Sequence, residues 1–204
     1  MQPTFRSVAV AGVLERIRAV GASEDEPAKQ RVRAREVRLA RKIYGRERAD
    51  LYGGASLAIT PQVGELLYVL AMAARPRVIV EFGASLGFST IFLASALRDL
   101  GGGSLLSSEF QPEKASRARE NLRDAGLTDL VELRTGDAME TLGGYEGSID
   151  LLFLDGWNDL YLPLLRLLES RLSAGALVLA DLSADDPELL VYQQYVQDPK
   201  HGYV

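Results

Sequence analysis

The sequence predicts an α/β protein built on a doubly wound, mostly parallel sheet, with helices at its N-terminal end. From residue 77 onward, short runs rich in branched aliphatic residues alternate with amphipathic helical segments, which is the pattern of repeated βαβ units. A glycine-rich turn follows the first of these short runs. The chain has 204 residues, a length that suits one domain with a single core.

The first part of the chain is expected to be mostly helical. A helix is predicted over 8–20, and the segment GASEDEP at 21–27 ends it. A longer helix is predicted from Pro27 to about Asp50, because proline is favoured at the first helical position. The Gly-rich sequence YGGAS at 52–56 then forms a joint to the rest of the chain.

A third helix is predicted after Thr60, a favoured N-cap residue that is followed by Pro61. This helix, with the sequence QVGELLYVLAMAA, is apolar over most of its surface and is expected to be buried. We expect residues 1–57 to form a helical cap segment and residues 58–204 to form the main domain, both within one globular unit.

Five strands are predicted in the rest of the chain, with right-handed crossovers between them. Helices are expected over FSTIFLASALRDL, from Pro112 to Gly126, at Ala138–Thr141, and over YLPLLRLLESRLSAG and DPELLVYQQYV. The predicted strands are 77–82, 105–109, 130–135, 149–154 and 176–181.

Composition excludes several classes of site. The chain has no cysteine, so disulfide scaffolds, thiolate zinc sites and cysteine nucleophiles are excluded. Its one histidine, His201, disfavours a multi-histidine metal site or a Ser-His-Asp triad, and we expect it to be a surface residue. No apolar run reaches the ~18 residues of a membrane span, and the N-terminus does not resemble a signal peptide. We therefore expect a cytoplasmic protein without a membrane partner.

Charge is unevenly distributed along the chain. The formal net charge is −5, but basic side chains are in excess between Lys29 and Arg48, and the remainder is acidic. This segment is open to two interpretations, a nucleic-acid-binding arm or a solvated helix face. We favour the helix face, because apolar residues interleave with the charges at helical spacing and the acidic remainder would repel a phosphate backbone. No nucleic-acid partner is expected.

The predicted strand ends bring carboxylates to one edge of the sheet. In an open α/β sheet, ligands bind beyond the carboxyl ends of the strands, so the residues found there indicate function. Every predicted strand ends in a carboxylate, or in a glycine with a carboxylate beside it, which is more than helix capping alone explains. These residues are Glu81, Gly83 and Gly87 after the first strand, Glu109 after the second, Asp137 after the third, Asp155 after the fourth and Asp181 after the fifth.

The glycine spacing indicates what kind of ligand would bind. Gly83 and Gly87 form a G-x-x-x-G pattern rather than the G-x-G-x-x-G of dinucleotide-binding folds. A pyrophosphate needs amide donors without nearby anions, whereas Glu81 precedes this loop and Asp155 is expected to face it. The loop therefore favours a cationic or zwitterionic ligand. Glu109 is placed to accept hydrogen bonds from both hydroxyls of a ribose, a feature that NAD sites share.

Five motifs stand in a fixed order along the chain: EFGASLGFST, SSEF, RTGDA, IDLLFLDGWNDLY and LVLAD. Over about residues 58–182 they resemble the class I S-adenosylmethionine-dependent methyltransferases, and among these the branch of catechol and caffeoyl-CoA O-methyltransferases. The resemblance implies a Rossmann-like fold, S-adenosylmethionine as cofactor, and O-methylation of a small phenol- or catechol-like acceptor. The alternatives are a non-catalytic S-adenosylmethionine-binding protein and, with less support, an NAD-dependent oxidoreductase.

The same resemblance implies roles for individual residues. The stretch Ile59–Gly64 would close over the methionyl tail of the cofactor, and the N-terminal helices would cover the acceptor pocket. The implied cofactor-binding residues are Glu81, Gly83 and Gly87 in the loop, Ser89 at the methionyl end, Asp155 at the amino group, Glu109 at the ribose, and Asp137, Ala138 and Trp157 around the adenine.

The expected metal site departs from the family pattern. Metal-dependent members bind Mg²⁺ through an aspartate after the fourth strand and an Asp-Asn pair after the fifth, and here these positions hold Asp155, Asp181 and Leu182. A metal could still be held with a substitute ligand such as Asp159 or Asp185. Because leucine cannot be a ligand, we expect Mg²⁺ binding to be weak or absent.

The expected base is also missing. Catechol-type members have a lysine one residue after the tryptophan, where this chain has Asn158. Asp155 and Asn158 are the candidate catalytic residues, although asparagine is a poor base. A metal-independent enzyme would rely on the acidity of its substrate or on another side chain as base, and the remaining alternative is a chain that binds cofactor without activity.

Two expectations concern the whole molecule. Family members usually end in an antiparallel strand pair, and too few residues follow Gln197 for one, so this pair is expected to be missing. A homodimer is expected, because the N-terminal helices carry apolar residues that a single domain leaves uncovered and two-fold dimers are the commonest oligomers.

Overall fold

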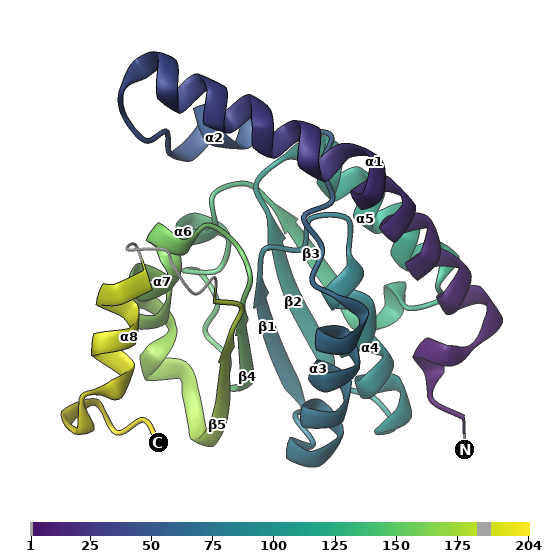
Figure 1. Cartoon of the computed structure of the whole chain (residues 1–204). Helices are drawn as coiled ribbons and strands as arrows, with labels where there is room; N and C mark the ends of the chain where they lie inside the picture. The colour runs from purple at the N-terminus through teal and green to yellow at the C-terminus, as the bar shows by residue number, and fades with distance from the viewer. Residues whose placement is uncertain (1, 183–188) are drawn as a thin grey trace.

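A five-stranded parallel sheet forms the centre of the computed structural model, which describes residues 2–182 and 189–204 (Figure 1). Its strand order is β3-β2-β1-β4-β5, so the direction in which strands are added reverses between β1 and β4. Every strand pair is parallel, which confirms the predicted doubly wound α/β fold. The strands are β1 (Val78–Phe82), β2 (Ser104–Glu109), β3 (Val131–Thr135), β4 (Ile149–Leu154) and β5 (Leu172–Ala180).

The fifth strand begins earlier than predicted. A 3₁₀ turn, η4 (Glu169–Arg171), ends the preceding helix, so the residues before Ala176 are extended rather than helical. Ile149 of β4 pairs with Leu172, whereas Leu151 pairs with Leu177, so the extra residues of β5 form a bulge. The sequence SAG predicts the end of a helix, because glycine commonly follows a helix. Glycine also marks bulges in strands, and that is its place here.

Helices cover both faces of the sheet (Figure 1). One face carries α3 (Pro61–Ala74), α4 (Phe88–Asp99) and α5 (Pro112–Asp124), and the other carries α6 (Ala138–Thr141), α7 (Tyr161–Leu168) and α8 (Leu189–Gln197). Short 3₁₀ turns lie at η1 (Thr4–Arg6), η2 (Thr128–Leu130), η3 (Asn158–Leu160) and η5 (Pro199–His201).

The core is divided by the sheet into two apolar layers. Successive side chains of β1 point to opposite faces, so Ile79 packs with the residues of α4, and Val80 packs with those of α7. Both strand residues are fully buried. The sheet is thus held rigidly between helices, and its carboxyl edge is a fixed platform for side chains.

The N-terminal segment differs from the prediction. A single helix, α1 (Val8–Leu39), runs through GASEDEP with Pro27 inside it, so the predicted break at 21–27 and the predicted helix start at Pro27 are wrong. Ile17 and Ala28 are buried on either side of that segment. Ile17 packs in the main core and Ala28 packs in a separate cluster with Ile43 and Tyr52, and this packing outweighs the weak local helix-breaking signal.

The first helix also ends earlier than the predicted limit at Asp50. Ala40 is left-handed, with φ 51°, and its amide donates to the carbonyl oxygens of Glu36 and Val37, which closes the helix. After a short turn, α2 (Gly45–Leu51) lies beneath the end of α1 and over the carboxyl edge of the sheet (Figure 1). The predicted long helix is therefore two helices.

The third helix is buried on one face only. Gly64, Leu67 and Ala71 are buried, and a side chain at Gly64 would overlap the ring of Phe92. Leu66 and Val69 are 54% and 57% exposed. The prediction that this apolar helix is buried is therefore wrong for its outer face, which leaves apolar surface uncovered.

The last strand, β5, lies at one edge of the sheet. Residues 189–204 form α8, η5 and a short tail, and this described stretch contains no strand that pairs with β5. No helix in the described part of the chain is long and apolar enough to cross a membrane.

Candidate functional site

A cavity of about 300 Å³ opens at the carboxyl edge of the sheet. Its walls come from the loops after β1, β2, β3 and β4, from α2, and from the segment that leads into α3. Seven of the predicted site residues line it, namely Gly83, Ser89, Glu109, Asp137, Ala138, Asp155 and Trp157. The predicted residues Glu81, Gly87, Asn158, Asp181 and Leu182 are not among its lining residues.

The glycine loop lies against the neighbouring strand ends. Gly83 has φ 99°, and a Cβ atom there would overlap the backbone oxygen of Asp155. The amides of Gly83 and Ala84 donate to the carbonyl oxygen of Ser108 at 3.1 and 2.9 Å. Only glycine allows the loop to come this close to both β2 and the residues after β4.

Glu81 braces the site from below rather than lining it. It is fully buried and accepts hydrogen bonds from the hydroxyls of Ser89, Thr90 and Ser107 at 2.7, 2.6 and 2.6 Å. Burial raises the pKa of Glu81, and these hydrogen bonds act against that increase. The carboxyl thus ties β1 to β2 and to the start of α4, and it fixes the hydroxyl of Ser89, which does line the cavity.

Glu109 presents a preoriented carboxylate to the cavity. Its Oε2 accepts a hydrogen bond from the amide of Ser85, and its Oε1 accepts one from the amide of Gln111, both at 2.8 Å. Burial raises the pKa of Glu109, while the two amides and the positive charge of Lys114 oppose the increase. Each oxygen retains further lone pairs, so the carboxylate is fixed and still able to accept hydrogen bonds.

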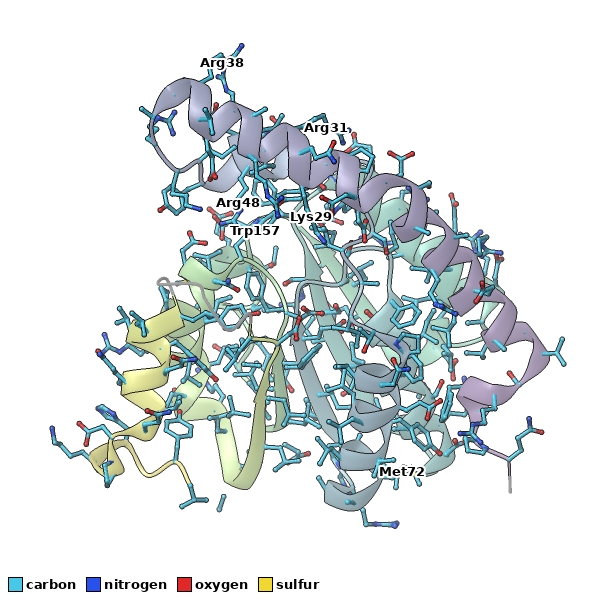
Figure 2. All side chains as sticks on the ribbon, in the orientation of Figure 1. Lys29, Arg31, Arg38, Arg48, Met72 and Trp157 are labelled. Carbon is cyan, nitrogen blue, oxygen red and sulfur yellow. The ribbon has the colours of Figure 1, made fainter. Side chains whose placement is uncertain are left out.

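The opposite wall is polar at its rim and aromatic towards the cap. Asp137 is the N-cap of α6, and its Oδ1 accepts from the amide of Met139 at 2.8 Å. The ring of Trp157 lies 5.5 Å from that of Tyr52, and the guanidinium of Arg48 lies 4.7 Å from the Trp157 ring. Figure 2 shows Arg48 and Trp157 at the junction between the cap helices and the sheet edge.

Asp155 and Asp181 end neighbouring strands and meet, as predicted. The amide of Asp155 donates to the carbonyl of Phe82, and that of Asp181 donates to the carbonyl of Leu154, so both residues continue the sheet. The two carboxyl groups therefore lie close together at the carboxyl edge of the sheet. Burial, and the negative charges of Asp181 and Glu81, raise the pKa of Asp155 well above its ordinary value.

The described oxygen donors do not fit a Mg²⁺ centre. Mg²⁺ prefers six oxygen ligands, whereas the ends of β4 and β5 offer only the two carboxyl groups of Asp155 and Asp181. Within 2–182 and 189–204, no group of three or more potential metal-ligating side chains occurs. Leu182 is 42% exposed, and the proposed substitute ligand Asp185 lies outside the described residues.

Sequence reasoning missed several residues of the cavity wall. The hydroxyl oxygens of Ser56 and Ser108 are buried in the cavity wall without a hydrogen-bond partner in the described structure. Gln111 and Lys114 are buried in the wall beneath α2. Lys114 had a detectable signal, because it stands four residues before Ala118 on the apolar face of its helix.

Comparison with known proteins identifies the class to which this fold and site belong. Residues 80–181 match the family described as "Methyltransferase domain", and the chain belongs to that family. The resemblance to class I methyltransferases is thereby confirmed.

Individual relatives refine the comparison. The chain is 31% identical over 142 residues to a catechol O-methyltransferase of Niastella koreensis, covering 68% of this chain and 63% of that protein. It is 30% identical to the O-methyltransferase TomG of Streptomyces achromogenes, solved in complex with SAM, with a TM-score of 0.58 and coverage of 71% and 63%. An O-methyltransferase of Bacillus cereus, solved with SAH, shares the fold at 22% identity, with a TM-score of 0.68 and coverage of 92% and 80%. The chain thus spans less than two thirds of the first two proteins.

Proposed function

We propose that this protein transfers a methyl group from S-adenosylmethionine to a hydroxyl of a small phenol- or catechol-like molecule. The observation that carries the proposal is Glu109, a buried carboxylate fixed by two amides at the edge of a cavity. Such a carboxylate accepts from both hydroxyls of a ribose in one orientation. The names of the catechol O-methyltransferase and of TomG support the same reaction.

The cavity fits S-adenosylmethionine in its chemistry. The buried hydroxyls of Ser56 and Ser108 have no hydrogen-bond partner in the described structure. A polar ligand in the cavity would supply one. The loop that begins at Gly83 packs directly against Asp155 and lines the cavity with its backbone. The carboxyl pair of Asp155 and Asp181 offers negative charge to a cationic end of the ligand.

We assign the remaining cofactor contacts on the same basis. Gly83 and Gly87 shape the loop that holds the methionyl end, and Ser89 contributes its hydroxyl oxygen there. Asp155 accepts from the amino group, and Glu81 holds the loop and Ser89 in place from within the core. The adenine lies among Asp137, Ala138 and Trp157, which line the cavity together.

When bound, the sulfonium of the cofactor supplies the methyl group, and its positive charge is lost in the transfer. The residues of this chain hold donor and acceptor in line and exclude water, which is where most of the acceleration in such a reaction arises. The acceptor hydroxyl must also lose its proton. We assign this step to Asp155, which lines the cavity and can accept a proton in its carboxylate form. Asn158 has an amide side chain that cannot serve as a base.

The first test concerns the cofactor. Glu109→Ala removes a charged acceptor, so we expect the dissociation constant for S-adenosylhomocysteine, measured by calorimetry, to rise about tenfold to a hundredfold. Glu132→Ala, which removes an exposed glutamate of β3, is the matched control and should leave binding unchanged. An unchanged dissociation constant in Glu109→Ala would refute the assignment, and tight NAD binding would favour an oxidoreductase instead.

The second candidate function is that of an S-adenosylmethionine-binding protein without activity. Two residues support it, because Asn158 stands where the family pattern has a base and Leu182 stands where it has a metal ligand. Turnover on a panel of catechols and other phenols separates the two. We expect methylation both with Mg²⁺ and in chelator. Cofactor binding without turnover on any acceptor would favour the inactive alternative, and loss of all activity in chelator would contradict the weak metal site.

We also propose that the protein is a cytoplasmic homodimer. The exposed side chains Leu66 and Val69 on the outer face of α3 support an association of two copies. Light scattering over a range of concentrations tests the dimer, and a monomer mass at every concentration would contradict it. Cell fractionation tests the location.

A further inference from the structure

Lys114 is a buried cation in the wall of the cavity. It lies on α5, is 4% exposed, and lines the cavity next to Glu109. In residues 2–182 and 189–204 its ammonium makes no hydrogen bond and no ion pair within 4.0 Å. A buried lysine without direct partners is costly, so its ammonium is expected to have a function in the liganded protein.

The charges around Lys114 explain why it can remain in this position. Glu109 of β2 and Asp25 of α1 face it with negative charge, and Arg117 of its own helix faces it with positive charge. Burial lowers the pKa of Lys114, and the two carboxylates oppose that decrease. A cation near two anions is thus tolerated there.

Neither Asp25 nor Glu109 accepts a hydrogen bond from Lys114 in the described structure. Asp25 accepts from the amides of Ser56 and Leu57 through Oδ1, at 2.7 and 3.1 Å. Glu109 accepts from two amides of its own, as described above. The ammonium therefore keeps its donors for a group that enters the cavity.

The donors and acceptors at this end of the cavity match a vicinal diol. A carboxylate only accepts hydrogen bonds and an ammonium only donates them, whereas each hydroxyl of a diol donates one and accepts others. Glu109 alone satisfies the hydrogens of the diol and leaves its oxygens without a donor. An adjacent ammonium completes the set.

We propose that Lys114 is a second ribose-binding residue, whose ammonium donates a hydrogen bond to a ribose hydroxyl oxygen while Glu109 accepts the hydroxyl hydrogens. This inference rests on the proposed function, because the ribose belongs to the proposed cofactor. A consequence is that Lys114 also favours the carboxylate form of Glu109, because its positive charge opposes the effect of burial.

Binding of S-adenosylhomocysteine measured by calorimetry tests the proposal. Lys114→Met should raise the dissociation constant at pH 7 by about tenfold to a hundredfold, the range for a lost charged hydrogen bond. Arg123→Met, which removes an exposed cation from the same helix, is the control and should bind like the unmodified protein. Thermal melts establish that each variant folds, and Lys114→Gln replaces Lys114→Met if the latter does not.

The pH profile separates binding from a merely structural role. Affinity should fall on the acid side as Glu109 gains a proton, and in Lys114→Met this fall should begin at higher pH, because the stabilising positive charge is gone. Asp25, Arg117 and Glu81, which also face this pair, are unchanged in the variant. Lys114→Arg keeps the charge and should return the acid limb to its original position.

Analogues that lack one ribose hydroxyl locate the contact. Removing the 2′- or the 3′-hydroxyl should raise the dissociation constant for the unmodified protein. For the analogue that lacks the hydroxyl bound by Lys114, this increase should be smaller in Lys114→Met. Binding of Lys114→Met within twofold of the unmodified protein, or equal penalties for both analogues in both proteins, would overturn the inference alone. Failure of the unmodified protein to bind S-adenosylhomocysteine would overturn the proposed function as well.

Discussion

At the scale of single residues, Gly83 sets how closely the loop after β1 approaches the chain after β4. Its φ of 99° is unfavourable for any other residue, and a Cβ atom would overlap the backbone oxygen of Asp155. We therefore expect Gly83→Ala to lower the free energy of unfolding by about 1–3 kcal/mol, and to weaken cofactor binding, since backbone would have to move in the cavity wall. Urea unfolding and calorimetry measure the two effects.

Gly144 provides the matched control for this substitution. It lies in a turn, has no positive φ, and a Cβ atom there would meet nothing within 4 Å. Gly144→Ala should leave both stability and binding close to those of the unmodified protein. If the two alanine variants behave alike, the close contact between Gly83 and Asp155 is not what limits the loop.

The site residues at the strand ends could be predicted from the sequence. The buried residues that support the site from inside the fold were harder to predict. Glu109 and Asp155 follow directly from the rule that ligands bind beyond parallel strands. The inward direction of Glu81 follows from period-two alternation, since it shares a face with Ile79, but a carboxylate buried among three hydroxyls is not evident from a motif. Lys114 was missed because a lysine in an amphipathic helix is usually assigned to the solvent face.

At the scale of elements, α1 shows why local signals failed at the N-terminus. Asp25 would normally favour a turn, but its carboxylate accepts from the amides of Ser56 and Leu57, far along the chain. The hydroxyl of Ser23 donates to the carbonyls of Ala19 and Val20, so it adds to the helix instead of ending it. The partners of Asp25 are brought to it only by the tertiary fold, so a local sequence pattern does not contain them.

The cap is held by a small apolar cluster of its own, which makes a prediction at this scale. Ile43 is fully buried among Ala28, Val32, Tyr52 and Ala55. Ile43→Ala removes the largest aliphatic contact between α1 and α2, a change that costs about 2–5 kcal/mol in a core. We expect faster amide hydrogen exchange in α2, with little change in the sheet, because the cluster is separate from the two main layers.

Val37 provides the control for the cap, because it lies on α1 but is 81% exposed. Val37→Ala should leave exchange in α2 unchanged. Gly45 and Ala49 of α2 line the cavity, so loosening the cap should also weaken cofactor binding in Ile43→Ala. Exchange that increases equally in the sheet and in α2 would mean that the cap does not open as a separate unit.

At the scale of the whole molecule, the fold was predictable because its signal is repeated. Alternation of short apolar strands with helices occurs along most of the chain, so an error in one element, such as the start of β5, does not change the topology. The cap carries no such repetition, and its position over the cavity depends on tertiary contacts alone. The enclosed part of the site was therefore harder to predict than its open edge.

The proximity of Asp155 and Asp181 should make the stability of the folded protein depend on pH. Burial and the neighbouring carboxyl raise the pKa of Asp155 in the folded state, whereas in the unfolded chain it is ~3.9. Between these two values the folded protein binds more protons than the unfolded chain, so stability from this group is complete below ~3.9 and is lost as pH rises through the folded value. Asp99 and Asp150 have lowered pKa values, so their effect appears only below pH ~4, where stability falls as pH falls.

Asp181→Asn should remove the repulsion while keeping a hydrogen-bonding side chain beside Asp155. We expect this variant to be more stable than the unmodified protein at pH 8, and to show a smaller decrease in the free energy of unfolding between pH 5 and pH 8, measured by urea titration. Asp159→Asn, which removes an exposed acid from the same loop region, controls for the general loss of negative charge. Parallel pH curves for the unmodified protein and Asp181→Asn would show that Asp181 does not raise the pKa of Asp155, and a bound cation would then be the simplest account of their proximity.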